Sequence, residues 1–134
     1  MWKKLTTASL LLLLLSACGT SPEDYRETLL ELGVSWEDEA FLEQVKQGNL
    51  TVLELFLKGG MALETRDRSG ATALMYAALN GHVEATALLV EEGAQVNAQD
   101  NLGRRPLDYA TVHPESGAFK ILASAGALYG TAPE

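Results

Sequence analysis

The sequence has 134 residues, with 18 acidic and 10 basic side chains and a formal net charge of −8. This length allows one small domain, and the acidity argues against binding to nucleic acid or to anionic lipid headgroups. The single cysteine excludes a disulfide within the chain and a metal site made of several thiolates.

The first 17 residues have the pattern of a signal peptide. Lys3 and Lys4 precede an apolar stretch over residues 5–15, which is too short to cross a bilayer of roughly 30 Å as a helix. The stretch ends in Leu15-Ser16-Ala17-Cys18, which resembles the lipobox of bacterial lipoproteins. The resemblance implies cleavage before Cys18 and lipidation of that cysteine. Removal of the two lysines changes the formal net charge to −10.

A lipidated Cys18 would anchor the protein in a bacterial cell envelope. Gly19, rather than an aspartate, follows the cysteine, as in lipoproteins that are sent to the outer membrane. We therefore expect a periplasmic location at the outer membrane. An ordinary secretory signal with an incidental cysteine is the alternative interpretation.

Residues 18–34 are predicted to form a short tether and an N-terminal helix. Ser21-Pro22-Glu23-Asp24 is typical of a helix start, and Gly33 can end the helix after Leu32. The apolar positions are expected to pack on the domain: Tyr25, Leu29, Leu30 and Leu32.

A repeat at a spacing of 33 residues follows. Seven positions from Asp67 to Gly93 match seven positions from Asp100 to Gly126, with identical or similar residues. The pairs are Asp67/Asp100, Gly70/Gly103, Leu74/Leu107, Tyr76/Tyr109, Ala77/Ala110, Leu88/Ile121 and Gly93/Gly126. The same shift backwards reaches Phe41, Gly48, Leu55 and Gly60. The sequence thus contains three units.

The middle unit carries the pattern of a known family. Residues 67–82, Asp-Arg-Ser-Gly-Ala-Thr-Ala-Leu-Met-Tyr-Ala-Ala-Leu-Asn-Gly-His, resemble the ankyrin repeat, and residues 83–100 continue the resemblance. It implies two helices per repeat, and a tight turn at Asp-x-x-Gly that projects as a finger. Thr72 is placed to cap the first helix of this unit.

We predict an all-α fold: an ankyrin-repeat solenoid of about three helix-turn-helix repeats with short β-turn fingers, preceded by one N-terminal capping helix. The predicted divisions are a signal peptide (1–17), the tether and helix (18–34), the ankyrin domain (35–128) and a frayed tail (129–134). The repeats are expected at approximately 35–66, 67–99 and 100–128. The polar start of the first repeat indicates a capping repeat.

The sequence predicts no catalytic residue, metal site or cofactor. His82 lies at the family's Gly-His position, where the imidazole braces the turn between helices. A pair of Asp108 and His113 is the alternative, enzymatic interpretation, but no recognisable nucleophile accompanies it.

Four of the basic residues fall at or beside the fingers: Arg66, Arg68, Arg104 and Arg105. On an acidic protein they would make a basic edge suited to an acidic face of a protein partner. The ankyrin resemblance also implies that the partner binds at the finger tips and at the exposed face of each first helix. The predicted partner-binding residues are Arg66, Arg68, Ser69, Ala71, Leu79, Asn80, Asn101, Leu102, Arg104, Arg105, Val112 and His113, with Lys46 and Gln47 as counterparts in the first unit.

These features predict a membrane-anchored, periplasmic, monomeric protein-binding module that holds or inhibits another protein. An immunity protein against a periplasmic toxin enzyme and a structural envelope lipoprotein are alternatives within non-enzymatic functions.

Overall fold

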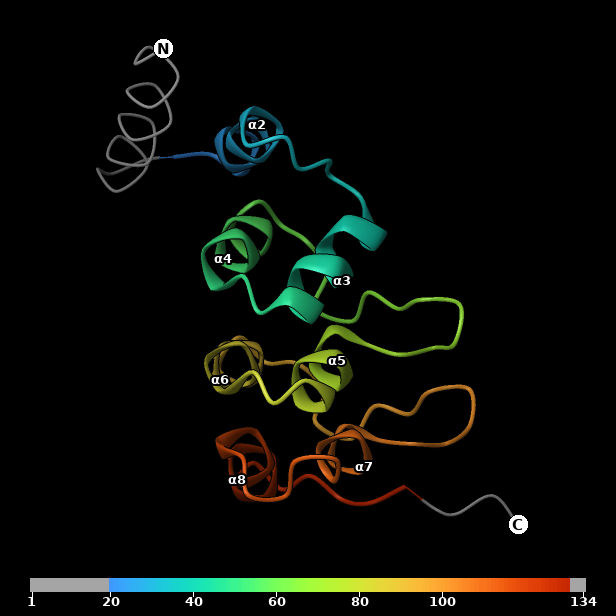
Figure 1. Ribbon diagram of the computed structural model, residues 1–134. Helices are drawn as coiled ribbons and strands as arrows, with labels where there is room; N and C mark the ends of the chain where they lie inside the picture. Colours follow the sequence, from blue (N-terminus) through green and yellow to red (C-terminus); the bar gives the residue numbers. More distant parts are fainter. Residues whose placement is uncertain (1–19, 131–134) are drawn as a thin grey trace.

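The computed structural model describes residues 20–130, which form seven helices and no strand (Figure 1). The helices are α2 (Pro22–Glu31), α3 (Asp38–Gln47), α4 (Leu50–Lys58), α5 (Ala73–Leu79), α6 (Val83–Glu91), α7 (Pro106–Ala110) and α8 (Gly117–Ser124). None of these helices is long and apolar enough to cross a membrane. The predicted signal peptide and Cys18 lie outside the described residues.

The helices stack in two columns. The inner column contains α3, α5 and α7, and the outer column contains α2, α4, α6 and α8 (Figure 1). Two long loops, at residues 59–72 and 92–105, project beyond the inner column as the fingers (Figure 1). The predicted all-α solenoid of three two-helix repeats with a preceding helix is confirmed.

All four outer helices end with the same pair of backbone hydrogen bonds. In the longer bond of this pair, the amide of the third residue after the helix donates to the carbonyl five residues earlier, in the pattern of a Schellman motif. These bonds join Val34 to Leu29, Met61 to Phe56, Ala94 to Leu89 and Ala127 to Leu122, at 2.9, 2.9, 2.9 and 3.0 Å. Helices α3 and α5 of the inner column end in the same way, and it is the place of α2 against α4 in the outer column that makes α2 the outer helix of an incomplete repeat.

The connection after α2 is shorter than its counterparts. Residues 34–36 lie between Gly33 and the helix cap at Glu37, whereas residues 61–71 and 94–104 fill the equivalent connections. The first repeat consequently has no finger in the described structure. The N-terminal part of α3 remains open on the inner side.

The core runs through the stack without a break. At its N-terminal end, Phe56 contacts two aromatic rings: Trp36 at 5.3 Å and Phe41 at 5.4 Å between ring centroids. Arg26 covers this cluster, because its Nε donates to the Gly59 carbonyl at 2.8 Å and its guanidinium lies 4.6 Å from the Trp36 ring. This packing fixes α2 on α4.

Helix α2 buries fewer apolar residues than expected. Leu29 is fully buried and Tyr25 is half-buried, but Leu30 and Leu32 are 62% and 42% exposed. Tyr25, Thr28 and Leu29 form the face that meets α4, and Leu30 lies about 100° around the helix from Leu29. Among residues 20–130, no helix precedes α2 in the stack and no segment covers its other side.

The start of the predicted frayed tail is held in place. The Leu128 amide donates to the Asn97 side chain at 2.7 Å, and the Gly130 amide donates to the Asp108 carboxylate at 2.8 Å. The Leu128 contact repeats the bond between the Gln95 amide and Glu64, 33 residues earlier. Residues 126–130 thus follow the path of a further repeat. Residues 131–134 lie outside the described range.

Candidate partner-binding surface

Each finger is built around one aspartate. The Asp67 carboxylate accepts hydrogen bonds from the amides of Ser69 and Ala71, at 2.8 and 3.1 Å, and from the Ser69 hydroxyl at 2.7 Å. An antiparallel bridge between Arg66 and Thr72 closes the base of the finger. The Asp-x-x-Gly spacing produces this turn because a short carboxylate can satisfy amides two and four residues ahead.

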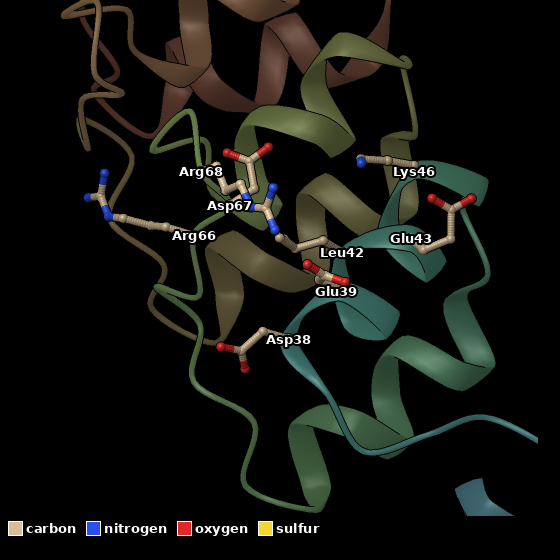
Figure 2. A pocket seen from close by; sticks show the side chains of 8 residues that line it. All are labelled: Asp38, Glu39, Leu42, Glu43, Lys46, Arg66, Asp67 and Arg68. Atoms are coloured by element: carbon tan, nitrogen blue, oxygen red, sulfur yellow. The ribbon is translucent and has the colours of Figure 1, made fainter.

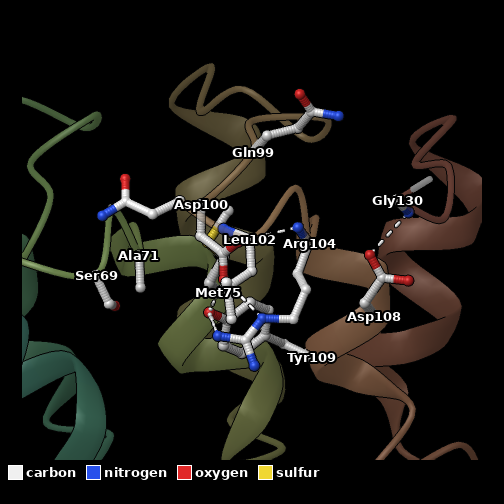
Figure 3. Close-up of polar contacts among 12 residues, drawn as sticks. Ser69, Ala71, Met75, Gln99, Asp100, Leu102, Arg104, Asp108, Tyr109 and Gly130 are labelled. Atoms are coloured by element: carbon white, nitrogen blue, oxygen red, sulfur yellow. Dashed lines mark hydrogen bonds and ion pairs between the residues drawn. The ribbon is translucent and has the colours of Figure 1, made fainter. Parts of the chain in front are cut away.

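The finger of the third repeat has the same design. The Asp100 carboxylate accepts from the amides of Leu102 and Arg104 at 2.8 and 2.9 Å. It also binds the Arg104 guanidinium, whose Nε lies 2.8 Å from Oδ2 (Figure 3). This is the one ion pair within 4.0 Å among residues 20–130.

A tyrosine joins each finger to its inner helix. Tyr76 on α5 donates to Asp67, and Tyr109 on α7 donates to Asp100 at 2.6 Å. Burial favours the neutral form of Asp67, but the hydrogen bonds from Tyr76, Ser69 and Ala71 outweigh it and lower its pKa to about 2. The same balance lowers the pKa of Asp100. Both carboxylates are therefore charged at neutral pH.

The two fingers also bind each other. The Asn101 amide donates to the Ser69 carbonyl at 2.9 Å, and its side-chain amide donates to the Arg68 carbonyl at 3.0 Å. Gly70, with φ of +79°, faces Asn101 so closely that a Cβ would lie 2.6 Å from Asn101 Oδ1. The two fingers consequently form one continuous edge.

Three of the four predicted finger arginines have partners within the chain or are partly buried. Arg66 donates to the carbonyls of Gly70 and Gln99, at 3.0 and 2.6 Å. Arg104 is held by Asp100 and Tyr109, and Arg105 is half-buried, with an Nε that is buried and unpaired in the described structure. Only the Arg68 guanidinium is exposed and without a hydrogen bond or ion pair among residues 20–130.

The other predicted residues divide by exposure. Ala71 is 1% exposed and drops out of the candidate surface, because the carbonyl and amide of this residue close the finger and its methyl group points inward. Leu79 is half-buried. Leu102 and Val112 are 62% and 59% exposed. The remaining exposed positions are Ser69, Asn80, Asn101, His113 and Gln47, with Lys46 half-buried.

A groove lies between α3 and the finger of the second repeat, with a volume of about 620 Å³ (Figure 2). Its lining residues are Asp38, Glu39, Leu42, Glu43, Lys46, Arg66, Asp67 and Arg68. From the sequence, the polar start of the first repeat indicates only a capping repeat, and that start includes Asp38, Glu39 and Glu43. The 33-residue shift places Glu43 at the position of Tyr76 and Tyr109, on the inner face of the repeat, and this signal would have identified it.

The two histidines have different surroundings. His82 Nε2 lies 2.8 Å from the Lys46 carbonyl, so the imidazole connects the second repeat to the first, whereas the Gly-His position predicts a brace for the turn between helices. The Asp108 carboxylate accepts from the amides of Arg105 and Gly130, and no hydrogen bond joins it to His113 in the part of the chain that is described. Residues 20–130 contain no group of three or more His, Cys, Asp or Glu side chains arranged to hold a metal ion.

Comparison with known proteins identifies the architecture. The sequence model of ankyrin repeats, in three copies, matches residues 41–131. This chain belongs to the ankyrin-repeat family. Proteins of this family are typically interaction modules without catalytic activity.

The ankyrin chain is similar to Neurogenic locus notch homolog protein 1 of Xenopus laevis, with 36% identity over 94 residues, or 69% of this chain and 3% of that protein. It is 34% identical over 91 residues to mouse protein phosphatase 1 regulatory subunit 27, covering 67% of this chain and 59% of that one. The crystal structure of the human ASB11 ankyrin repeat domain has a TM-score of 0.62 and 28% identity, covering 66% of this chain and 40% of that one. The similarity thus spans only part of each relative.

Proposed function

We propose that this ankyrin protein is a lipid-anchored, periplasmic binding module that holds or inhibits a protein partner through its fingers and inner helices. The observation that carries the binding role is the pair of fingers, hydrogen-bonded to each other, beside an open groove. A surface held by internal hydrogen bonds loses less conformational entropy on binding than a flexible one. The mouse relative is by name a regulatory subunit of a protein phosphatase, which supports action through a protein partner.

The proposed interface combines apolar and polar contacts. Leu102 and Val112, both more than half exposed, lie at the finger and at the end of α7. Arg68 and Asn80 supply exposed polar groups on the second repeat. Interfaces with exposed apolar anchors surrounded by polar groups are typical of protein partners. Of the four arginines predicted to contact an acidic face of the partner, only Arg68 remains proposed for that contact, because the others are held within the chain or partly buried.

Site-specific photo-crosslinking in living cells tests the binding face. A benzophenone amino acid replaces Ser69 or Asn80 on the proposed face, and Glu84 on the outer helix α6 serves as the matched exposed control. We expect one partner to crosslink from both proposed positions and not from Glu84. Crosslinks from Glu84 alone, or from none of the three positions, would contradict the proposed function and favour a structural envelope protein.

Cell fractionation tests the anchor separately. The Cys18→Ser variant cannot be lipidated, so we expect it to move from the membrane fraction to the soluble periplasmic fraction. Analytical ultracentrifugation of the same soluble variant tests the proposed monomeric state. Unchanged membrane retention of the Cys18→Ser variant would rule out the lipid anchor while leaving the binding proposal open to the crosslinking result.

A further inference from the structure

The groove beside α3 has walls of opposite charge that do not neutralise each other. Asp38, Glu39 and Glu43 project from α3 on one side, and Arg68 projects from the finger on the other (Figure 2). No ion pair within 4.0 Å joins the two walls in the described structure. The space between the two walls is the groove of about 620 Å³.

The acidic wall results from the positions of three acidic residues along α3. Glu39 and Glu43 are four residues apart and share one face of the helix, and Asp38 stands in its first turn. All three side chains are exposed. Glu43 accepts a hydrogen bond from the Gln47 side-chain amide at 2.9 Å, and none of the three carboxylates forms an ion pair within 4.0 Å among residues 20–130.

The missing finger makes this wall accessible. In the second and third repeats, a long connection precedes the inner helix and forms the finger, whereas residues 34–36 are the whole connection before the cap of α3. The Asp67 and Asp100 carboxylates accept hydrogen bonds from the amides of their own fingers. The acidic residues of α3 hold no such turn in the described structure.

The finger wall carries Arg66 and Arg68, and the Arg68 side chain extends from a backbone that is held in place. The Arg68 carbonyl is held by Asn101, which fixes the backbone from which the side chain extends. The neighbouring Arg66 donates to two backbone carbonyls and is not available in the same way. At the far end of the groove, Lys46 lies 4.4 Å from the centre of the Tyr76 ring, so its ammonium limits the acidic wall to the part of α3 that precedes Lys46.

We propose that this groove binds a peptide segment of the partner that carries two or more basic side chains for Asp38, Glu39 and Glu43 and one acidic side chain for Arg68. The inference rests on the proposed binding function and specifies its partner. A nucleic acid would be repelled by the acidic wall, and a wholly acidic peptide would match Arg68 alone. Charges of both signs across one groove give orientation as well as attraction.

Selection of random twelve-residue peptides displayed on phage tests this chemistry, with the full-length lipidated protein in detergent micelles as bait. We expect enriched peptides to contain at least two Lys or Arg and one Asp or Glu. Synthetic copies should bind about tenfold more weakly to the Glu39→Lys/Glu43→Lys variant and about fivefold more weakly to Arg68→Glu. Replacing the acidic residue of the peptide with Lys should restore its binding to Arg68→Glu.

The matched control is Glu84→Lys/Glu92→Lys, which changes the net charge equally on exposed residues of the outer helix and its cap. We expect less than a twofold effect there. The milder Glu39→Gln/Glu43→Gln variant repeats the test, with urea midpoints confirming that each variant is folded.

Three results would overturn the inference. An equal loss of binding by Glu39→Lys/Glu43→Lys and by Glu84→Lys/Glu92→Lys would show that the effect comes from net charge alone. Enrichment of uncharged peptides that bind normally to Glu39→Lys/Glu43→Lys but not to Leu102→Glu would place binding elsewhere on the proposed face, so the proposed function would survive while this inference fails. No enrichment over the unselected library would contradict both.

Discussion

The two fingers share a backbone design but differ in how they treat their charges. In the third repeat, the buried Asp100 carboxylate binds two backbone amides, the Tyr109 hydroxyl and the guanidinium of Arg104. In the second repeat, Ala71 occupies the position of Arg104, and the Ser69 hydroxyl supplies the additional hydrogen bond to Asp67. The third finger is thus neutralised internally, whereas the second is not.

This difference separates stabilising charges from available ones. Arg104 is spent on holding the third finger, which ends the stack of repeats and has no finger beyond it in the described structure. Arg68 stands at a corner of the second finger that is already fixed by Asn101, so its side chain is not needed for the turn. Similar arginines in a sequence can therefore have opposite roles, which depend on what the neighbouring position contains.

The largest expected effect is the loss of the Asp100 carboxylate. Asp100→Ala leaves two amides, a tyrosine hydroxyl and the Arg104 guanidinium without their acceptor, so we expect the free energy of unfolding to fall by about 3 kcal/mol. Urea denaturation monitored by circular dichroism measures it. Asp38→Ala, an exposed aspartate without a recorded hydrogen bond, is the control and should change stability by less than about 0.5 kcal/mol. Equal losses of unfolding free energy in Asp100→Ala and Asp38→Ala would show that the Asp100 carboxylate does not stabilise the fold.

The contact between the fingers is tested by a glycine pair. Gly70→Ala places a methyl group against Asn101 in addition to straining a backbone with φ of +79°. Gly93→Ala, with φ of +97° and no atom within 4 Å of the new Cβ, adds the strain alone. We expect a loss of about 2 kcal/mol for Gly70 and about 1 kcal/mol for Gly93, measured by the same denaturation. A larger loss for Gly93→Ala would contradict close packing of the two fingers.

The Asp67 carboxylate of the second finger should make the free energy of unfolding depend on pH in the acidic range. The Asp67 pKa is lowered from 3.8 to about 2, so its contribution is fully present above about pH 4 and is lost as the pH falls through 2. Between pH 5 and pH 2, we expect the free energy of unfolding to fall by about 1 to 2 kcal/mol less in Asp67→Asn than in the native protein. Superimposable pH profiles for the two proteins would show that the carboxylate charge of Asp67 is not stabilising.

The repeats and the helix pairs follow from residues that the sequence displays directly. The spacing of Asp67, Tyr76 and Gly93 from their counterparts fixes the period, and Thr72 accepts the predicted helix-capping bond from the Met75 amide at 3.4 Å. The site was harder to predict. Whether Arg104 faces a partner or its own Asp100 depends on side-chain geometry, and burial of Ala71 depends on how the finger closes.

The groove escaped prediction for a different reason. A 33-residue period describes what is present in each repeat, and the first repeat is distinguished by a connection that is shortened to residues 34–36. The shortening exposes Glu39 and Glu43 on α3, although their sequence context resembles any solvated helix face. A local deletion thus creates the candidate site, and its consequence becomes visible only when the helices are placed side by side.

The smallest effect should distinguish the two arginines most clearly. Methionine keeps much of the arginine stem while removing the charge, so Arg104→Met tests the ion pair and Arg68→Met is its matched control. We expect Arg104→Met to lower the free energy of unfolding by about 1 kcal/mol, because the Arg104 side chain is 49% exposed and solvent weakens its pairing with Asp100.

Arg68→Met should change stability by less than about 0.5 kcal/mol while weakening the binding of a selected peptide. If Arg68→Met destabilised the fold as much as Arg104→Met, Arg68 would belong to the scaffold. The distinction between a closed third finger and an open second finger would then be lost.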